Sequence, residues 1–213
     1  TPRVLFEGDL AIAELCAVRL DGEVFSIGRC FAPIDEIDRP ALRAASLASG
    51  LNPRLIAEQR TAAWIWGARD DPPDPQQFCA ALDARVAHRI SNWLVVREVV
   101  IEAADRAPLA SLLVTTPLRT AVDLARFSDD FDEDRATVSA LMRLGSFGAS
   151  ECLDELNRRR NLPNKRMAAQ RLSGVHPIDV VHGVNSSHRV EHPIEVSRIT
   201  HLKDVPADRQ TVA

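Results

Sequence analysis

The stretch Val114-Thr-Thr-Pro-Leu-Arg-Thr-Ala-Val-Asp-Leu-Ala-Arg-Phe127 contains the clearest helix start in the sequence. Thr116 is suited to cap the helix, and Pro117 then occupies the first helical position, where its missing N–H costs nothing. Arg119 and Asp123 are four residues apart, so we expect them to face each other and form an ion pair. The same spacing places four apolar side chains on one face: Leu118, Ala121, Val122 and Ala125.

The residues before this helix favour β-structure. Over residues 77–115 the pattern is β-rich, and residues 93–101 form the strongest predicted strand. The preceding segment, residues 70–77, has three prolines and three acidic residues in eight positions, which predicts a loop at a subdomain boundary. Further upstream we expect a helix over residues 39–49. A second helix is expected from Pro53 to Trp66, with Asn52 as its cap.

The N-terminal residues suggest part of a winged helix-turn-helix. Residues 9–20 predict a short helix capped by Asp9, and a pair of strands is expected to follow up to residue 33. A helix followed by two strands resembles the last helix and wing of that module, which needs two more helices in front. Only eight residues precede Asp9, so we expect an incomplete remnant.

The C-terminal half is predicted to be helical and to end in a tail. Helices are expected near residues 134–144, 149–159 and 164–172. The tail holds five of the six histidines, and we interpret it as extended and facing solvent or a partner, not as a metal site. The sequence therefore predicts an α+β fold with a winged-helix-like N-terminal remnant, a central mixed α/β region, a helical C-terminal half and an extended tail. The expected domain bounds are 1–36, 37–172 and 173–213.

The composition is that of a cytoplasmic protein. The 213 residues carry 26 basic and 30 acidic side chains, a net charge of −4, which argues against a general nucleic-acid-binding surface. No stretch approaches the roughly 18 uncharged apolar residues of a membrane span, and no signal peptide is apparent. Four scattered cysteines without a C-x-x-C pair are most simply reduced thiols.

The charges are polarised near the C-terminus. Residues 129–150 hold five acids against two arginines, whereas residues 151–172 hold six basic residues against three acids. The two arms are either solvated faces that attract each other, or the basic arm docks an acidic partner or a nucleic-acid backbone. The residues proposed for partner binding are Arg158, Arg159, Arg160, Lys165 and Arg166.

No known catalytic motif is present. The sequence lacks a Walker loop, G-x-G-x-x-G, G-x-S-x-G and H-E-x-x-H, and Gly145-Ser146 is not followed by the paired acids of a nucleotidyltransferase. The acidic run over residues 129–134 fails the calcium-loop pattern and instead suggests acids at a helix start. We therefore predict no catalytic residues, no metal and no cofactor.

Two segments together resemble the AbiEi family of antitoxins. Arg60-Thr-Ala-Ala-Trp64 resembles that family's T-A-A-W helix, and Thr115-Thr-Pro-Leu-Arg-Thr-Ala-Val-Asp-Leu124 is similar to its T-x-P-x-R-T-x-x-D-L helix. The likeness covers roughly residues 23–172. The motif residues are Thr116, Pro117, Arg119, Thr120 and Asp123. They serve either as a structural cap and brace or as direct contacts to a toxin.

The resemblance implies an antitoxin of a type IV toxin–antitoxin system, and the Arg- and Ala-rich composition agrees with an actinobacterial source. Its partner would be a nucleotidyltransferase toxin that acts on tRNA, held in a hetero-oligomer by direct protein–protein binding. One alternative is covalent neutralisation, with the chain as an atypical serine protein kinase. Another is a DNA-binding autoregulator of its operon, which the missing helices of the winged module put in doubt.

Overall fold

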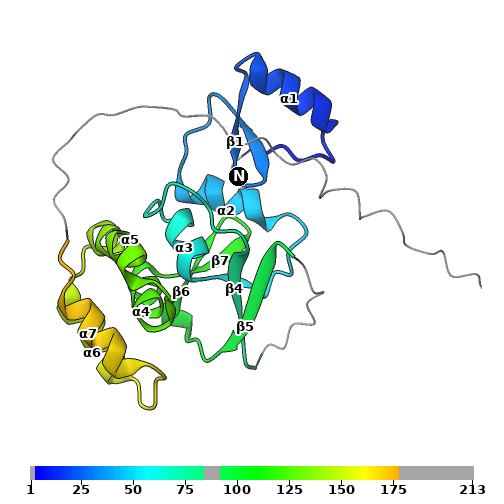
Figure 1. The fold of residues 1–213 in the computed structure, drawn as a ribbon. Helices are drawn as coiled ribbons and strands as arrows, with labels where there is room; N and C mark the ends of the chain where they lie inside the picture. Colours follow the sequence, from blue (N-terminus) through cyan, green and yellow to red (C-terminus); the bar gives the residue numbers. More distant parts are fainter. Residues whose placement is uncertain (1–2, 84–91, 178–213) are drawn as a thin grey trace, which may run out of the picture. The chain divides into compact units, whose positions relative to one another are not determined.

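The computed structural model describes residues 3–83 and 92–177, which belong to one compact unit. The strands precede a run of four consecutive helices, and the larger sheet is mixed, so the predicted α+β class is confirmed (Figure 1). In order, the elements are α1 (Ile12–Leu20), β1 (Val24–Ile27), β2 (Cys30–Pro33), α2 (Pro40–Ala48), β3 (Ile56–Ala57), α3 (Gln59–Ile65), β4 (Gln76–Ala81), β5 (Leu94–Val99), the short 3-10 helix η1 (Ala103–Asp105), β6 (Arg106–Leu109), β7 (Leu112–Thr115), α4 (Pro117–Phe127), α5 (Phe131–Gly145), α6 (Ala149–Arg158) and α7 (Lys165–Ser173).

The N-terminal helix and strand pair are present as expected. Strands β1 and β2 form an antiparallel hairpin, and α1 packs on it around buried Leu15, Val24 and Phe31. The predicted cap is wrong, however, because the helix begins at Ile12. The Asp9 carboxylate is already engaged in the preceding turn, where it accepts a hydrogen bond from the backbone N–H of Phe6 at 2.9 Å.

The hairpin turn packs inward. Gly28 adopts a φ of +56°, and a Cβ at this position would lie 2.9 Å from the Ser46 hydroxyl and 3.2 Å from the Trp64 ring. The Cys30 thiol, next in the turn, donates to the backbone carbonyl of Ser46. Ser46 of α2 and Trp64 of α3 therefore lie against one side of the turn, while Gly28 and Arg29 are themselves exposed.

A five-stranded mixed sheet forms the centre, in the order β5-β4-β3-β7-β6. The pairs β4–β5 and β3–β7 are parallel, and the pairs β3–β4 and β6–β7 are antiparallel. The β-rich interpretation is thus confirmed for residues 77–83 and 92–115, while residues 84–91 lie outside the described part of the chain. The proline-rich segment that precedes β4 lies within the same compact unit, since it joins α3 to the sheet.

The helix expected from Pro53 to Trp66 begins only at Gln59, so that prediction is wrong in its first half. Asn52 closes a turn instead, with its side-chain oxygen accepting from the N–H of Arg54. Ile56 and Ala57 then complete the sheet between β4 and β7 and are fully buried. Burying two central strand residues outweighs a local helix start, which is worth only about 1 kcal/mol.

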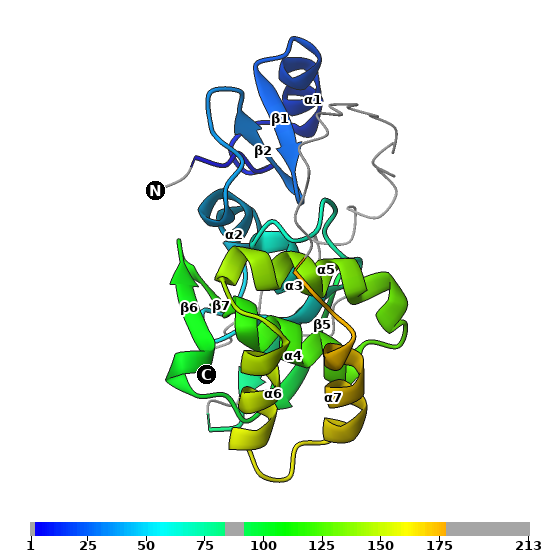
Figure 2. The same ribbon diagram turned by 90° about the vertical axis from the view of Figure 1, so that its left-hand side faces the viewer.

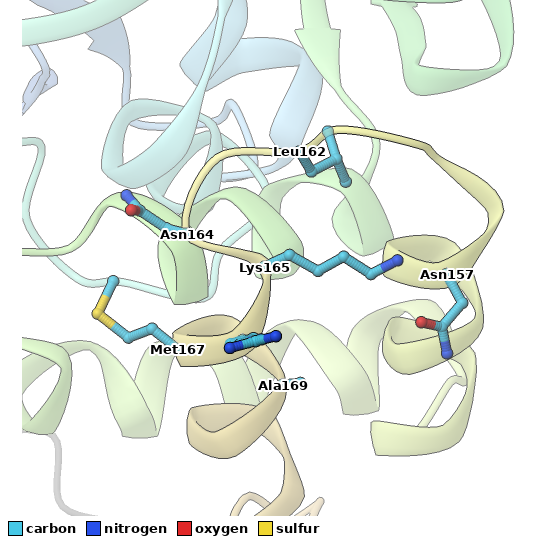
Figure 3. Close-up of a pocket in the computed structure, with 7 residues that line it drawn as sticks. Asn157, Leu162, Asn164, Lys165, Met167 and Ala169 are labelled. Carbon is cyan, nitrogen blue, oxygen red and sulfur yellow. The ribbon is translucent and has the colours of Figure 1, made fainter.

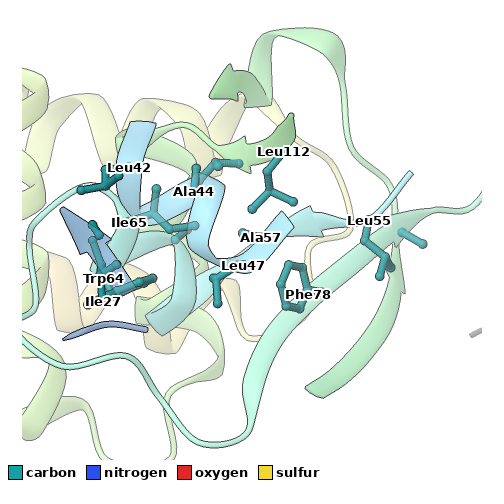
Figure 4. Packing of buried hydrophobic residues seen from close by; sticks show 14 residues of the cluster. Ile27, Leu42, Ala44, Leu47, Leu55, Ala57, Trp64, Ile65, Phe78 and Leu112 are labelled. Atoms are coloured by element: carbon teal, nitrogen blue, oxygen red, sulfur yellow. The ribbon is translucent and has the colours of Figure 1, made fainter. Parts of the chain in front are cut away.

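Two hydrophobic cores flank α3. The sheet core includes Phe78, Trp64 and Ile65 with the inward faces of α2 and α3 (Figure 4). The helical core joins Ala63 of α3 to the apolar faces of α4, α5, α6 and α7. Because one short helix contributes to both cores, the sheet and the helical half are packed together along α3.

The predicted C-terminal helices are confirmed as α5, α6 and α7, with α6 and α7 both packed on α4 (Figure 2). Helix α5 begins earlier than expected, at Phe131, because Asp130 accepts hydrogen bonds from the N–H groups of Asp132 and Glu133. The tail is described only to residue 177, so the predictions for residues 178–213, including four of the tail histidines, lie outside the described residues. None of the described helices is long and apolar enough to cross a membrane.

Candidate functional site

The start of α4 is built as the sequence predicts. Thr116 accepts a hydrogen bond from the N–H of Arg119 at 3.3 Å, and Pro117 occupies the first helical position. The Thr120 hydroxyl lies 2.7 Å from that of Thr115 and also donates to the Thr116 carbonyl. The indole N–H of Trp66, just after α3, donates to the carbonyl of Thr115 at 2.8 Å, which ties the end of α3 to the end of β7 in front of α4.

The predicted pair on α4 is the centre of a larger buried network. Arg119 Nε lies 2.7 Å from Asp123 Oδ2, which confirms the pair. Arg119 also contacts Asp105 at 2.9 Å, and Asp123 contacts Arg126 at 2.9 Å. All four residues are at most 4% exposed, so water screens these charges little. Asp105 and Arg126 were not singled out by the sequence.

The network extends to the sheet and to the end of α6. Arg97 of β5 forms two hydrogen bonds with the buried carboxylate of Glu58 and lies 3.5 Å from Asp123. On the other side, Arg159 donates to Asp105. Alternating positive and negative side chains therefore join β5, the start of α3, α4, η1 and the end of α6. Because each buried charge relies on its neighbours, removing one partner is costly even where the intact pairs add little net stability.

Hydrogen bonds and neighbouring positive charges favour the ionised form of the Asp105 carboxyl group. Burial alone opposes its ionisation, but hydrogen bonds from Arg159 and from the Glu102 N–H, together with the charge of Arg119, lower the pKa of Asp105 below its usual value. For Arg119, burial opposes the charged form, and the charges of Asp123 and Asp105 outweigh it and raise the pKa. The paired, charged state is thus self-consistent.

This network makes stability depend on acid pH. Since the folded pKa of Asp105 is depressed below the unfolded value of about 3.9, its stabilisation is complete above that value and is lost as the pH falls through the folded pKa. In urea unfolding between about pH 5 and pH 3, the wild type should lose more stability than Asp105→Asn does. Equal losses in the two proteins would contradict this assignment.

A second ion-pair cluster holds α5 against α3. Asp134, fully buried in the first turn of α5, accepts from Arg60 Nε at 3.0 Å, from Arg69 Nη1 at 3.2 Å and from the Ser128 hydroxyl at 2.7 Å. Arg60 also contacts Glu133 at 3.0 Å. The acidic run is thus a helix start, as expected. Two of its acids contact Arg60 in the first turn of α3 and Arg69 in the loop after α3.

The five basic residues proposed for partner binding fall into two groups. Arg158 pairs with Glu155 and Glu102, and Arg159 pairs with Glu155 and Asp105, so both are engaged within the chain. The other three lie in the loop after α6 and in the first turn of α7: Arg160, Lys165 and Arg166. Within residues 3–83 and 92–177, these three form no ion pair with a carboxylate.

An open depression of about 730 Å³ lies between the ends of α6 and α7. In Figure 3, the Lys165 side chain extends toward Asn157 of α6, and Leu162 sits in the connecting loop. Its lining combines two cations, two amides and three apolar side chains: Lys165, Arg166, Asn157, Asn164, Leu162, Met167 and Ala169. This surface, here called the α6–α7 surface, consists of these seven residues and Arg160.

Hydrogen bonds anchor the α6–α7 surface on α4. Arg126 donates to the Pro163 carbonyl at 3.1 Å, and the Asn164 side-chain amide donates back to the Arg126 carbonyl at 3.0 Å. Arg171 of α7 donates to the carbonyls of Ala125 and Ser128. The buried network therefore connects directly to the loop and the first turn of α7, which carry Arg160, Lys165 and Arg166.

The four cysteines are free thiols. Burial raises the pKa of Cys30 and Cys152 to about 12 and raises that of Cys79 further, so these three are protonated at neutral pH. These three buried cysteines are apolar core residues, not reactive thiols. Within the described residues, no three His, Cys, Asp or Glu side chains gather in a metal-binding arrangement.

Comparison with known proteins identifies the family. The family model described as "AbiEi antitoxin C-terminal domain" matches residues 55–174, more than half of the chain. The chain belongs to the AbiEi antitoxin family. The match includes the whole sheet, both ion-pair clusters and the α6–α7 surface. The resemblance carried by the T-A-A-W and T-x-P-x-R-T-x-x-D-L segments is therefore confirmed at the level of the family.

Two further comparisons add little detail to the AbiEi assignment. The crystal structure of the RV2827C protein from Mycobacterium tuberculosis aligns with a TM-score of 0.44 and 19% sequence identity, over 83% of this chain and 73% of that one. No curated protein matches the chain.

The AbiEi motif residues are mostly inaccessible. Arg119, Thr120 and Asp123 are 4%, 0% and 1% exposed, and Thr116 and Pro117 are half-buried at the helix start. Contact of a toxin with Arg119, Thr120 or Asp123 would require α4 to be uncovered. The geometry therefore favours the interpretation of the motif as a structural cap and brace.

Proposed function

We propose that this AbiEi antitoxin neutralises a nucleotidyltransferase toxin in the cytoplasm by binding it directly through the α6–α7 surface. The observation that carries the proposal is the set of three cations, Arg160, Lys165 and Arg166, displayed without carboxylate partners within the described residues on an anchored hairpin of the AbiEi domain. A preorganised charged surface favours fast and specific association with a partner of opposite charge.

The chemistry expected of the toxin supports this choice. Enzymes that transfer nucleotides hold their metal ions with acidic side chains, which gives them a negatively charged site. A basic surface on an otherwise acidic chain is complementary to such a site. Binding of this kind needs no catalytic group in the antitoxin.

Reversing the three unpaired charges of the α6–α7 surface tests the proposal. In the variant Arg160→Glu/Lys165→Glu/Arg166→Glu, we expect the Kd for the purified toxin to rise at least about 100-fold, because like charges brought together cost several kcal/mol. Co-expression should then no longer protect cells from the toxin. Isothermal titration calorimetry and growth of the co-expressing cells measure the two effects.

A matched control separates local from global charge effects. Arg19, Arg39 and Arg54 are exposed and lie outside the α6–α7 surface, so reversing all three gives the same change in net charge. This control is expected to bind and protect like the wild type. Unchanged binding by the α6–α7 variant, or equal weakening in the control, would show that the contact lies elsewhere.

Operator binding by the N-terminal helix and hairpin is a separate candidate function. Their small core and antiparallel register form a helix-and-wing arrangement, but the turn of the hairpin lies against Ser46 and Trp64. A mobility shift on the operon's own promoter tests this activity. Loss of a shift at moderate salt would indicate backbone contacts without specific readout.

A further inference from the structure

We propose that the depression of the α6–α7 surface accepts an apolar side chain of the toxin, while carboxylates on the same toxin segment lie over Arg160, Lys165 and Arg166. This inference rests on the proposed function and specifies its contact. It follows from the combination of an apolar lining and a cationic rim in one place.

The lining indicates an apolar occupant. Leu162 and Ala169 pack against the helical core from below, and Met167 is 38% exposed beside them. An exposed methionine is polarisable and adapts its shape, which suits it to a binding surface. A space of about 730 Å³ has ample room for a large apolar side chain with its flanking residues.

The rim indicates a negatively charged occupant. Lys165 and Arg166 occupy the first turn of α7, where the helix dipole disfavours cations, and no acidic residue of that turn compensates them. The N-cap residue Asn164 forms no cap with its side chain, which is directed to the Arg126 carbonyl instead. Carboxylates of a partner would relieve this unfavourable arrangement.

The same features favour a protein over a nucleic acid. A phosphate backbone is bound by cations and N–H groups and makes no use of an apolar floor. A side chain buried in a pocket and surrounded by polar contacts is the usual centre of a protein–protein interface. The hairpin is also anchored before binding, since Arg126 and Arg159 fix both ends of the loop, which limits the ordering cost.

Two uncharged variants test the depression separately from the charges. Met167→Ala removes apolar contact at an exposed position, and Ala169→Trp fills the space. With the purified toxin as the probe in calorimetry, we expect the Kd to rise about 10-fold for Met167→Ala and more than about 100-fold for Ala169→Trp. Leu144→Ala, at another exposed apolar position in the helical half, should change the Kd less than about 2-fold.

The outcomes distinguish this inference from the proposed function. If the wild type binds and the charge-reversal variant does not, but Met167→Ala and Ala169→Trp bind like the wild type, the depression is not a contact and only the inference fails. If the wild type itself does not bind the toxin, the proposed function fails. If tRNA binds the wild type and Ala169→Trp equally and the toxin binds neither, the surface serves a nucleic acid and both fail. Circular dichroism and thermal melting confirm that each variant is folded.

Discussion

Asp123→Ala is expected to lower the free energy of unfolding by about 3–5 kcal/mol. The Asp123 carboxylate contacts Arg119 at 2.7 Å and Arg126 at 2.9 Å, and Arg97 lies 3.5 Å away. Removing it leaves three guanidinium groups close together, two of them almost fully buried, without their shared counter-charge. Urea unfolding followed by circular dichroism measures the loss.

The surface pair Asp132–Arg135 supplies the control for this prediction. This pair also lies within one α-helix and also has an N–O distance of 2.7 Å. The side chains of Asp132 and Arg135, however, are 86% and 46% exposed. Asp132→Ala should therefore cost less than about 1 kcal/mol. A loss below about 1 kcal/mol for Asp123→Ala as well would show that the buried network does not brace the fold.

Asp134→Ala is expected to have a similarly large effect, about 3–5 kcal/mol, because its carboxylate is fully buried and pairs with Arg60 and Arg69. The Ser128 hydroxyl also loses its acceptor. Helix α5 should detach from α3 more readily, so amide hydrogen exchange in the first turns of α5 should accelerate as global stability falls. Hydrogen exchange with mass spectrometry gives both readings.

Asp129→Ala is the matched control within the same acidic run. Asp129 is exposed and precedes the helix, so its replacement changes the net charge equally without opening a buried pair. We expect a change within about 0.5 kcal/mol and unaltered exchange in α5. Similar effects from both substitutions would mean that the acidic run acts through its total charge, not through Asp134.

The local features of α4 were predictable because they depend on neighbours in the sequence. A cap, a proline at the first position and an i, i+4 pair are all encoded within a few residues, and each is present. The partners that turn the pair into a network come from far along the chain, with Arg97 and Glu58 separated by 39 residues and Arg159 and Asp105 by 54. No local pattern specifies such contacts.

The late start of α3 shows how the sheet overrides a local signal. Asn52-Pro53 has the chemistry of a helix start, but Ile56 and Ala57 are needed between β4 and β7. A strand of only two residues is too short to show the alternation of apolar and polar side chains by which strands are predicted. Only the long-range pairing of the sheet reveals them.

The basic arm was found from segment charges, but charge sums do not reveal which residues are already paired. Arg158 and Arg159 both form ion pairs with Glu155 of α6. Arg158 also pairs with Glu102, just before η1, and Arg159 with Asp105 of η1, so both arginines hold the α6–α7 hairpin in place. Arg160, Lys165 and Arg166 remain as the displayed cations. The sequence thus indicated a basic segment, and the structure divides its cations into those paired within the chain and those without a carboxylate partner in the described residues.

The central claim, neutralisation by binding, is tested most directly by titrating the toxin's nucleotide-transfer activity with the full antitoxin chain in the presence and absence of ATP. We predict that inhibition reaches its end point at a fixed stoichiometric ratio, does not depend on ATP, and is reversed when the toxin is separated, with its intact mass unchanged. Inactivation by substoichiometric antitoxin that needs ATP and leaves the toxin heavier by a phosphoryl group would contradict the account and establish covalent modification instead.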